Sequence, residues 1–162
     1  MKPTSRPVAF FLRASLAIAI PLVLMPAAYS AKADTSPPVA APEIRKGILE
    51  TTAGVYEFTP NVCGIYEEDG IFDIEIQGSG TAPDGEVFYF DFSSIANEMS
   101  IELGVDAPYQ TAERQIRAGQ FVSKAFVVEV TDKLISVPEI TLVDEQGQQL
   151  DSNANLQIDC GA

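Results

Sequence analysis

Apolar and polar residues alternate over short runs in the second part of the chain. In the run 71–77, Ile74 and Ile76 alternate with polar residues, which is the period of a strand with one buried and one solvated face. In the run 86–92, Phe88, Phe90 and Phe92 fall on one side of a second strand. We expect these three rings to form the core on which the sheet is built.

Further runs of β-branched, aromatic and leucine residues predict more strands. They lie at residues 48–58, 99–103, 121–130, 134–137, 140–143 and 156–160. Pro138 has no backbone donor, so we expect it to separate two strands or to lie at a sheet edge. One segment, 109–118, is predicted as a helix that Gly119 ends as a C-cap.

Connections between these strands are short. Residues 78–85, for example, are rich in glycine, which is typical of a loop. Such connections leave no room for the crossovers that parallel strands need. The pattern therefore predicts an all-β domain over residues 47–162, built as a single antiparallel β-sandwich or partly open barrel of about eight strands.

The first 46 residues follow a different pattern. Basic residues precede an apolar run at 14–29, and Ala31 and Ala33 place small side chains before a cleavage point, as in a signal peptide. The run is too short and too interrupted by proline for an ordinary membrane-spanning helix. We expect residues 1–33 to be removed, residues 34–46 to form a proline-rich flexible linker, and the mature protein to have no membrane span.

The chain has two cysteines, Cys63 and Cys160. An exported protein reaches an oxidising compartment, where two such thiols pair. We therefore expect a structural disulfide that joins the two ends of the domain in a periplasmic or secreted protein. A redox role is not favoured, because redox-active pairs usually lie close together as C-x-x-C.

Composition and charge exclude several functions. The 162 residues include 23 acidic and 10 basic residues and no histidine, with a net charge of -13. Removal of residues 1–33 takes away four basic residues and no acidic one, so the net charge becomes -17. Such a surface repels nucleic acid, and the lack of histidine excludes the catalytic triads and metal sites that depend on it.

Acidic turns support one hypothesis about a metal. Asp151, Asn153 and Asn155 place oxygen-bearing side chains at alternate positions, and Asp144 precedes them; hard cations such as Ca²⁺ prefer these ligands. The pattern departs from an EF-hand, because Leu156 stands where that loop needs glycine. Two interpretations stay open: a calcium site of another geometry, or turns that favour Asp and Asn for their backbone preferences.

Two other features bear weakly on chemistry. Asp73 and Glu75 share a strand face at a spacing that acid–base hydrolysis can use, but 23 acidic residues produce such a pair by chance. We therefore do not expect an enzyme. Tyr109, beside Pro108 in a predicted surface loop, is the aromatic residue that we would test as a contact with a ligand.

Together, these features predict a non-catalytic binding or interaction module of the bacterial envelope, whose partner is a protein or another envelope component. An alternative is a structural subunit that assembles through an exposed sheet edge, with residues 34–46 as the donated strand. The three prolines of that segment argue against donation, because proline cannot donate to a strand ladder. Apart from the hypothetical calcium, we expect no cofactor.

Overall fold

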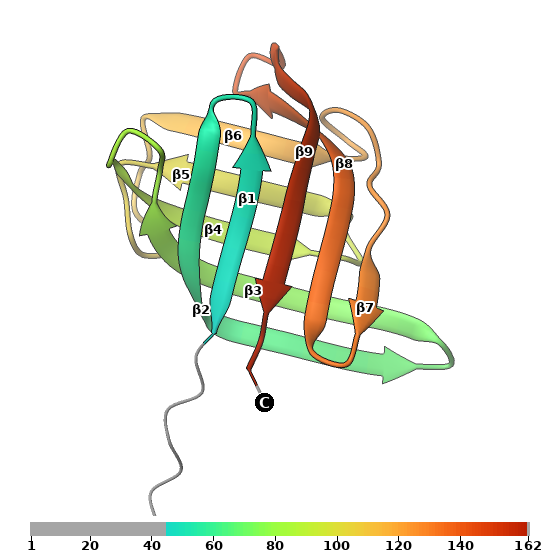
Figure 1. Ribbon diagram of the computed structural model, residues 1–162. Helices are drawn as coiled ribbons and strands as arrows, with labels where there is room; N and C mark the ends of the chain where they lie inside the picture. The colour runs from blue at the N-terminus through green and yellow to red at the C-terminus, as the bar shows by residue number, and fades with distance from the viewer. Residues whose placement is uncertain (1–44, 162) are drawn as a thin grey trace, which may run out of the picture. The chain divides into compact units, whose positions relative to one another are not determined.

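The computed structural model describes residues 45–161. In this part of the chain there are nine β-strands and no helix (Figure 1). The strands are β1 (Lys46–Thr51), β2 (Gly54–Glu68), β3 (Ile71–Thr81), β4 (Val87–Ser93), β5 (Glu98–Leu103), β6 (Arg114–Gly119), β7 (Glu129–Thr131), β8 (Leu134–Asp144) and β9 (Gln149–Asp159). The predicted signal peptide and most of the predicted linker lie outside the described residues.

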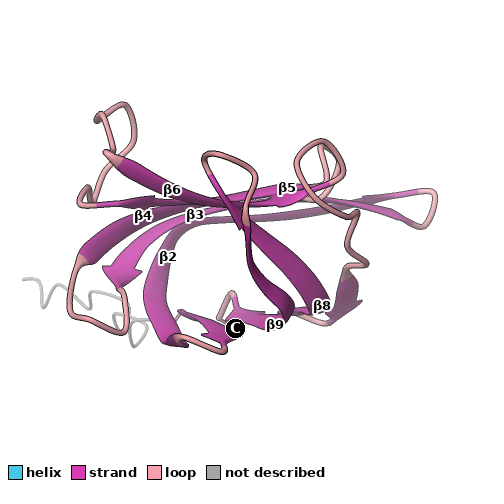
Figure 2. Cartoon of the chain, turned by 90° about the horizontal axis from the view of Figure 1, so that it is seen from above, coloured by secondary structure: helices cyan, strands magenta, loops and turns pink. Residues whose placement is uncertain are grey.

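Neighbours in sequence are mostly neighbours in the sheet, and all pairings are antiparallel. The strand order is β6-β5-β4-β3-β2-β1-β9-β8-β7. A further pairing of β6 with β8 closes the sheet into an eight-stranded barrel, to which β7 adds an extra strand on β8. Seen from above, the strands lie in two layers (Figure 2). The predicted all-β antiparallel fold is confirmed.

The seam between β6 and β8 is the shortest ladder of the closed barrel. It consists of two residue pairs, Ile116 with Asp144 and Arg117 with Val143. The start of β8 uses the same side to pair with β7, so only the end of β8 reaches β6. The seam therefore lies at one end of the barrel, beside the β8–β9 turn.

Strand β2 belongs to both layers. Its first part, residues 54–58, pairs with β1, whereas the part after an irregularity between Pro60 and Val62 pairs with β3 alone. Buried side chains occupy alternate positions from Tyr56 to Pro60, and none is buried afterwards. A bulge of this kind bends a strand and increases its twist, which lets β2 pass from one layer to the other.

An aromatic cluster fills the interior where β2 bends. Phe58 stacks on Phe90 with a ring-centroid distance of 4.2 Å, and Tyr56 meets Phe88 edge to face at 5.7 Å. As predicted, Phe88, Phe90 and Phe92 are buried. Aromatic pairs in these arrangements stabilise a core by about 0.5–1.5 kcal/mol each beyond the burial of their surface.

Two glycines make room for Phe58 on the neighbouring strands. Gly47 of β1 and Gly80 of β3 are its partners across the ladders. A Cβ atom at Gly47 would lie 2.1 Å from the ring of Phe58, and one at Gly80 would lie 2.0 Å from the carbonyl oxygen of Glu57. The ring of Phe58 therefore occupies the space that a side chain at Gly47 would fill, and Gly80 lets the backbone of β3 lie close to that of β2.

Gly80→Ala should strongly destabilise the fold, because its new methyl group meets backbone atoms that cannot rotate aside. We expect the free energy of unfolding in urea to fall by about 1–3 kcal/mol. Gly64→Ala is the matched control, since its Cβ would first meet the exposed Tyr66 ring, at 3.0 Å. Equal losses in both variants would contradict the packing role of Gly80.

The predicted helix at 109–118 is wrong. The chain there is a loop followed by β6, in which Ile116 and Ala118 are buried at alternate positions. A helix is stabilised mainly by burial of an apolar face, and this segment has one large aliphatic residue to bury. As a strand, the same residues complete the closed ladder between β5 and β8.

The predicted strand at 121–130 is also wrong for most of its length, and only β7 remains of it. Phe126 turns inward and stacks on Phe92 at 5.6 Å. The Asn97 side chain donates to the carbonyl of Phe126 at 2.8 Å and accepts from its N–H at 3.2 Å. Asn97 thus satisfies backbone groups that a neighbouring strand would otherwise pair.

Strand boundaries differ from the predictions near the start of the domain. The predicted strand 48–58 is a hairpin of β1 and β2 with Thr52 and Ala53 in its turn. The predicted loop 78–85 begins late, because β3 continues to Thr81. Two of the glycines that suggested a loop, Gly78 and Gly80, instead allow β3 to pack closely against β2.

Pro138 does not end a strand. β8 runs through it from Leu134 to Asp144, and the register with β9 is irregular between Val137 and Ile140. Glu139 has a φ of 55°, a left-handed conformation. Proline is therefore accommodated at a bulge, where its missing donor costs no ladder bond.

The predicted disulfide between Cys63 and Cys160 is present. Cys63 lies in the second part of β2, and Cys160 follows β9 directly. These two strands do not pair with each other. The bond therefore links parts of the barrel that the hydrogen-bond ladder leaves unconnected.

Replacement of both cysteines by serine should lower the free energy of unfolding by about 2–5 kcal/mol, because the unfolded chain is no longer cross-linked across 97 positions. Urea denaturation of the oxidised protein and of the double variant measures this difference. The wild-type protein under reducing conditions serves as the control and should resemble the variant. Identical midpoints for all three samples would contradict a stabilising role.

Candidate functional site

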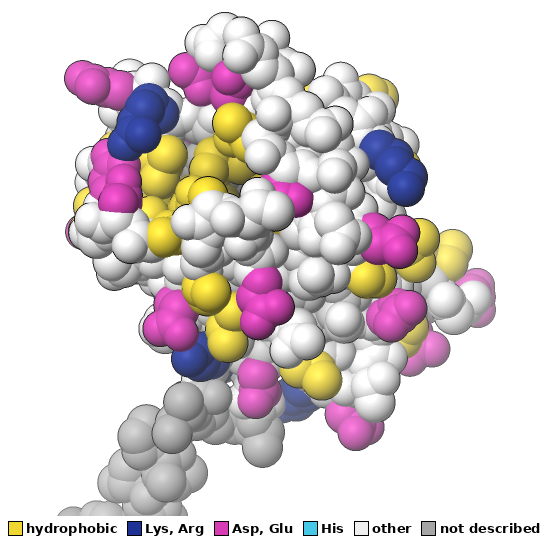
Figure 3. All heavy atoms as spheres, turned by 45° about the horizontal axis from the view of Figure 1, so that its top comes forward, with side chains coloured by type: hydrophobic (Ala, Val, Ile, Leu, Met, Phe, Trp, Pro, Cys, Tyr) yellow, Lys and Arg dark blue, Asp and Glu magenta, His cyan; other side chains and the backbone are white. Residues whose placement is uncertain are grey.

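A pocket of about 380 Å³ lies at the end of the barrel where the β6–β8 seam is located. We call it the mouth pocket. It is lined by the β1–β2 and β8–β9 turns and by the adjacent ends of β5 and β6: Thr51, Thr52, Ala53, Tyr56, Leu103, Arg114, Gln115, Ile116, Leu142, Asp144, Glu145, Leu150 and Asp151. Figure 3 shows a hollow on this side of the molecule, with hydrophobic side chains inside it and charged ones at its rim.

The floor of the mouth pocket is apolar. Tyr56, Leu103, Ile116 and Leu142 are buried side chains of four different strands. They belong to the inward-facing rows of β2, β5, β6 and β8, so the floor is the end of the hydrophobic core. Strand alternation places these residues there, and barrel closure brings them together.

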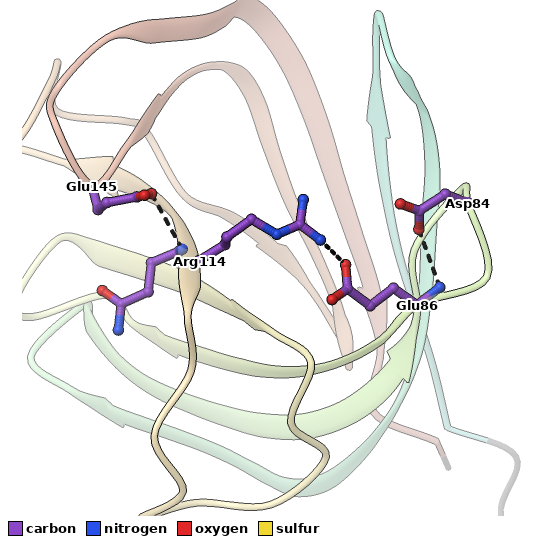
Figure 4. Close-up of polar contacts among 5 residues, drawn as sticks. Asp84, Glu86, Arg114 and Glu145 are labelled. Carbon is purple, nitrogen blue, oxygen red and sulfur yellow. Dashed lines mark hydrogen bonds and ion pairs between the residues drawn. The ribbon is translucent and has the colours of Figure 1, made fainter.

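An ion pair crosses part of the rim. Arg114 at the start of β6 contacts the carboxylate of Glu86, whose backbone N–H donates to Asp84 Oδ1 at 3.1 Å (Figure 4). The pKa of the nearby Tyr56 hydroxyl is raised, first by burial and then by Asp84 and Glu86, with Arg114 opposing them. Tyr56 therefore stays protonated at neutral pH and can offer a hydrogen-bond donor to a ligand.

Glu145, in the β8–β9 turn, lies over the seam. Its carboxylate accepts a hydrogen bond from the backbone N–H of Gln115 at 3.4 Å (Figure 4). Hydrogen bonds from its own backbone, from Gln146 and from Gln115 lower the pKa of Glu145. The turn thus carries a negative charge beside the mouth pocket and contacts β6 where the ladder is shortest.

Asp151 ties the two hairpins of the mouth together. It is only 6% exposed, and its Oδ2 accepts hydrogen bonds from Thr52 N–H at 2.6 Å and from Thr52 Oγ1 at 2.9 Å. Its Oδ1 accepts from Asn153 N–H at 2.8 Å. Burial opposes ionisation of Asp151, but these hydrogen bonds outweigh it and lower the pKa. Asp151 therefore serves the fold as a buried, well-bonded carboxylate.

Of the four residues suggested as calcium ligands, Asp144 and Asp151 line the mouth pocket, whereas Asn153 and Asn155 do not. Asp151, Asn153 and Asn155 lie within strand β9 rather than in a loop. Asp144 Oδ1 accepts from the backbone of Gln146 and Gln148 and closes the β8–β9 turn. Across residues 45–161, no group of three or more Cys, Asp or Glu side chains is placed to hold a metal. Calcium binding stays a prediction.

The other candidate residues from the sequence, Tyr109 and the pair Asp73 and Glu75, lie away from the mouth pocket. Tyr109 is in the loop between β5 and β6, as expected, with its side chain fully exposed and a φ of 65°. Asp73 and Glu75 are exposed on the outward face of β3. Neither Tyr109 nor this acidic pair lines the mouth pocket.

Sequence reasoning missed the mouth pocket, because its residues come from strand ends and turns far apart in the chain. The sequence pattern predicts a helix at Arg114 and Gln115 and places Tyr56 near the end of one long strand. Only the register and closure of the barrel bring them together.

Comparison with protein-family models, with curated proteins and with solved structures finds no match. The described residues contain no helix long and apolar enough to cross a membrane.

Asp151→Asn should destabilise the protein by about 1–3 kcal/mol at pH 7, because an amide cannot accept all three hydrogen bonds. The pKa of the native carboxyl is lowered, so its ionised form stabilises the fold above the unfolded-state pKa of about 3.9, and this contribution is lost as the pH falls. The deficit of the variant should therefore shrink in acid.

Chemical denaturation of both proteins between about pH 3 and pH 7 measures this effect. Asp106→Asn, at an exposed position in the β5–β6 loop, is the charge-matched control and should change little. A deficit that does not vary with pH would contradict the role of the charge of Asp151.

Proposed function

We propose that this chain is an exported, non-catalytic binding module of the bacterial cell envelope, and that a small ligand with an apolar part binds in the mouth pocket. The observation that carries the proposal is the pocket itself. Its volume of about 380 Å³ falls in the range typical of small-molecule sites, which combine an apolar lining with a few polar groups. An eight-stranded barrel is also wide enough to hold one small ligand.

The polar groups at the mouth favour binding over catalysis. The Glu86 carboxylate is paired with Arg114, and both oxygens of Asp151 accept hydrogen bonds from the fold. A general acid or base needs a proton-transfer group that is free to act on a substrate. The chain also has no histidine. These groups can instead orient a ligand whose apolar part enters the pocket.

Export is supported by two independent features. The basic and then apolar start of the chain is typical of a signal peptide. A disulfide between the only two cysteines suits a periplasmic or secreted protein, because such bonds persist in oxidising compartments. The acidic character of the chain keeps it dispersed there and disfavours nucleic acid as a partner.

Fluorescence titration with N-phenyl-naphthylamine, a neutral dye that brightens in apolar surroundings, tests the mouth pocket. We expect saturable binding to the wild-type protein and at least about ten-fold weaker binding to Leu150→Arg, because the new charge enters an apolar site. Leu134→Arg is the matched control. Leu150 is 49% exposed and lines the pocket, whereas Leu134 is 48% exposed and does not.

Unchanged binding in Leu134→Arg is part of the expected result. No saturable binding to the folded wild-type protein, or equal weakening in both arginine variants, would contradict the proposal. Circular dichroism and urea midpoints of the variants confirm that each is folded before binding is compared.

A further inference from the structure

The second part of β2 has a hydrogen-bonding edge that no strand among residues 45–161 covers. Residues 62–68 pair with β3 on one side and with no described strand on the other. In an antiparallel strand, every second residue directs its N–H and C=O to the same side. Along this part of β2, the lowest strand in Figure 1, a row of backbone donors and acceptors therefore has no strand partner among the described residues.

The hairpin of β2 and β3 also extends beyond its neighbours. β3 pairs with β4 only from Glu75 onward, so residues 71–74 have β2 as their one strand partner. After Pro60 no side chain of β2 is fully buried; Cys63, which is bonded to Cys160, and Ile65 are half-buried against the core. A free edge of this length is a template for strand addition, and proteins usually shorten, cover or bend such edges.

A second pocket adjoins this edge. We call it the hairpin pocket; its volume is about 340 Å³, and it is lined by Tyr66, Glu68, Asp69, Ile71, Asp73 and Ile95. Tyr66 and Asp73 are cross-strand partners, as are Glu68 and Ile71, so both pairs share the outer face of the hairpin. None of these residues lines the mouth pocket.

The hairpin pocket combines large apolar side chains with carboxylates. Tyr66 is 67% exposed, Ile71 64% and Ile95 60%. Carboxylates of Glu68, Asp69 and Asp73 surround them. An arginine or lysine side chain fits this chemistry: its methylene stem packs on isoleucine, and its cationic head meets carboxylates and the face of tyrosine.

We propose that an extended, basic segment of a partner protein adds as a strand to β2 at residues 62–68 and inserts an arginine or lysine side chain into the hairpin pocket. Backbone hydrogen bonds supply affinity in this mode, and the pocket supplies selectivity. Charge argues against a second copy as the occupant. Each copy presents the same acidic hairpin and a net charge of -13 in the full chain.

The test uses the chain from residue 34 onward, which contains the whole described fold. Fluorescence anisotropy measures binding of a labelled peptide of alternating arginine and valine, about eight residues long, the length of an ordinary strand. A second peptide is N-methylated at alternate residues, on the edge that would face β2. We expect it to bind at least about ten-fold more weakly, because its charge is unchanged but its donors are lost.

Variants locate the site. Tyr66→Ala and Asp73→Asn should each weaken binding several-fold, whereas Asp106→Asn removes the same charge from the β5–β6 loop and should have no effect. Hydrogen exchange followed by NMR should show new protection of amides within residues 62–68 when the peptide is bound.

Four results would overturn the proposal. Equal binding of the two peptides, or equal effects of Asp73→Asn and Asp106→Asn, would mean that only general charge attraction acts. Concentration-dependent dimers in light scattering, with these amides already protected, would make a second copy the occupant. In the fourth result, the amides of residues 62–68 are already protected without peptide and lose that protection when residues 34–44 are deleted. This result would mean that the chain's own segment 34–44 covers the edge. The peptides and variants report on the hairpin pocket and the β2 edge, so this proposal can be tested even if the dye does not bind in the mouth pocket.

Discussion

The fit of Phe58 between two glycines is the constraint on which the barrel depends. Phe58 stacks on Phe90, Gly47 opposite it leaves room for its ring, and Gly80 on the other side lets the β3 backbone lie close to β2. Just beyond Phe58, β2 bends from one layer into the other. Both candidate sites follow from this one strand, since Tyr56 lines the mouth pocket and Tyr66 the hairpin pocket.

The seam that closes the barrel is short, and a side chain adds to it. The seam of β6 with β8 has two residue pairs, and beside it the carboxylate of Glu145 accepts a hydrogen bond from the backbone N–H of Gln115 in β6. Asp151 joins β9 to the β1–β2 turn at the same end of the barrel. Glu145 and Asp151 also line the mouth pocket, so a change at either residue affects both the fold and the shape of the pocket.

The sequence correctly predicts strands in which apolar and polar residues alternate strictly. The prediction fails in segments whose secondary structure is decided by tertiary contacts. Ile74 and Phe90 sit in clear period-two patterns, and both are buried as expected. Phe126 lies in an equally apolar run, yet a single side chain, Asn97, satisfies its backbone and removes the need for a strand. The disulfide could be predicted because the chain has only two cysteines. The pockets could not, because they depend on strand register and barrel closure, which no local sequence pattern specifies.

The disulfide also fixes how the domain responds to mechanical load. Lys46 and Asp159 are paired neighbours, so force applied at the two ends of the domain would peel β1 from β9 one pair at a time. Cys160 is bonded to Cys63 at a sequence separation of 97, and a covalent bond cannot be peeled. Only the segment before Cys63 can be drawn out. Tension between the two ends of the domain would therefore stretch the first hairpin and leave the rest of the barrel, with the hairpin of β2 and β3, held in a closed covalent loop.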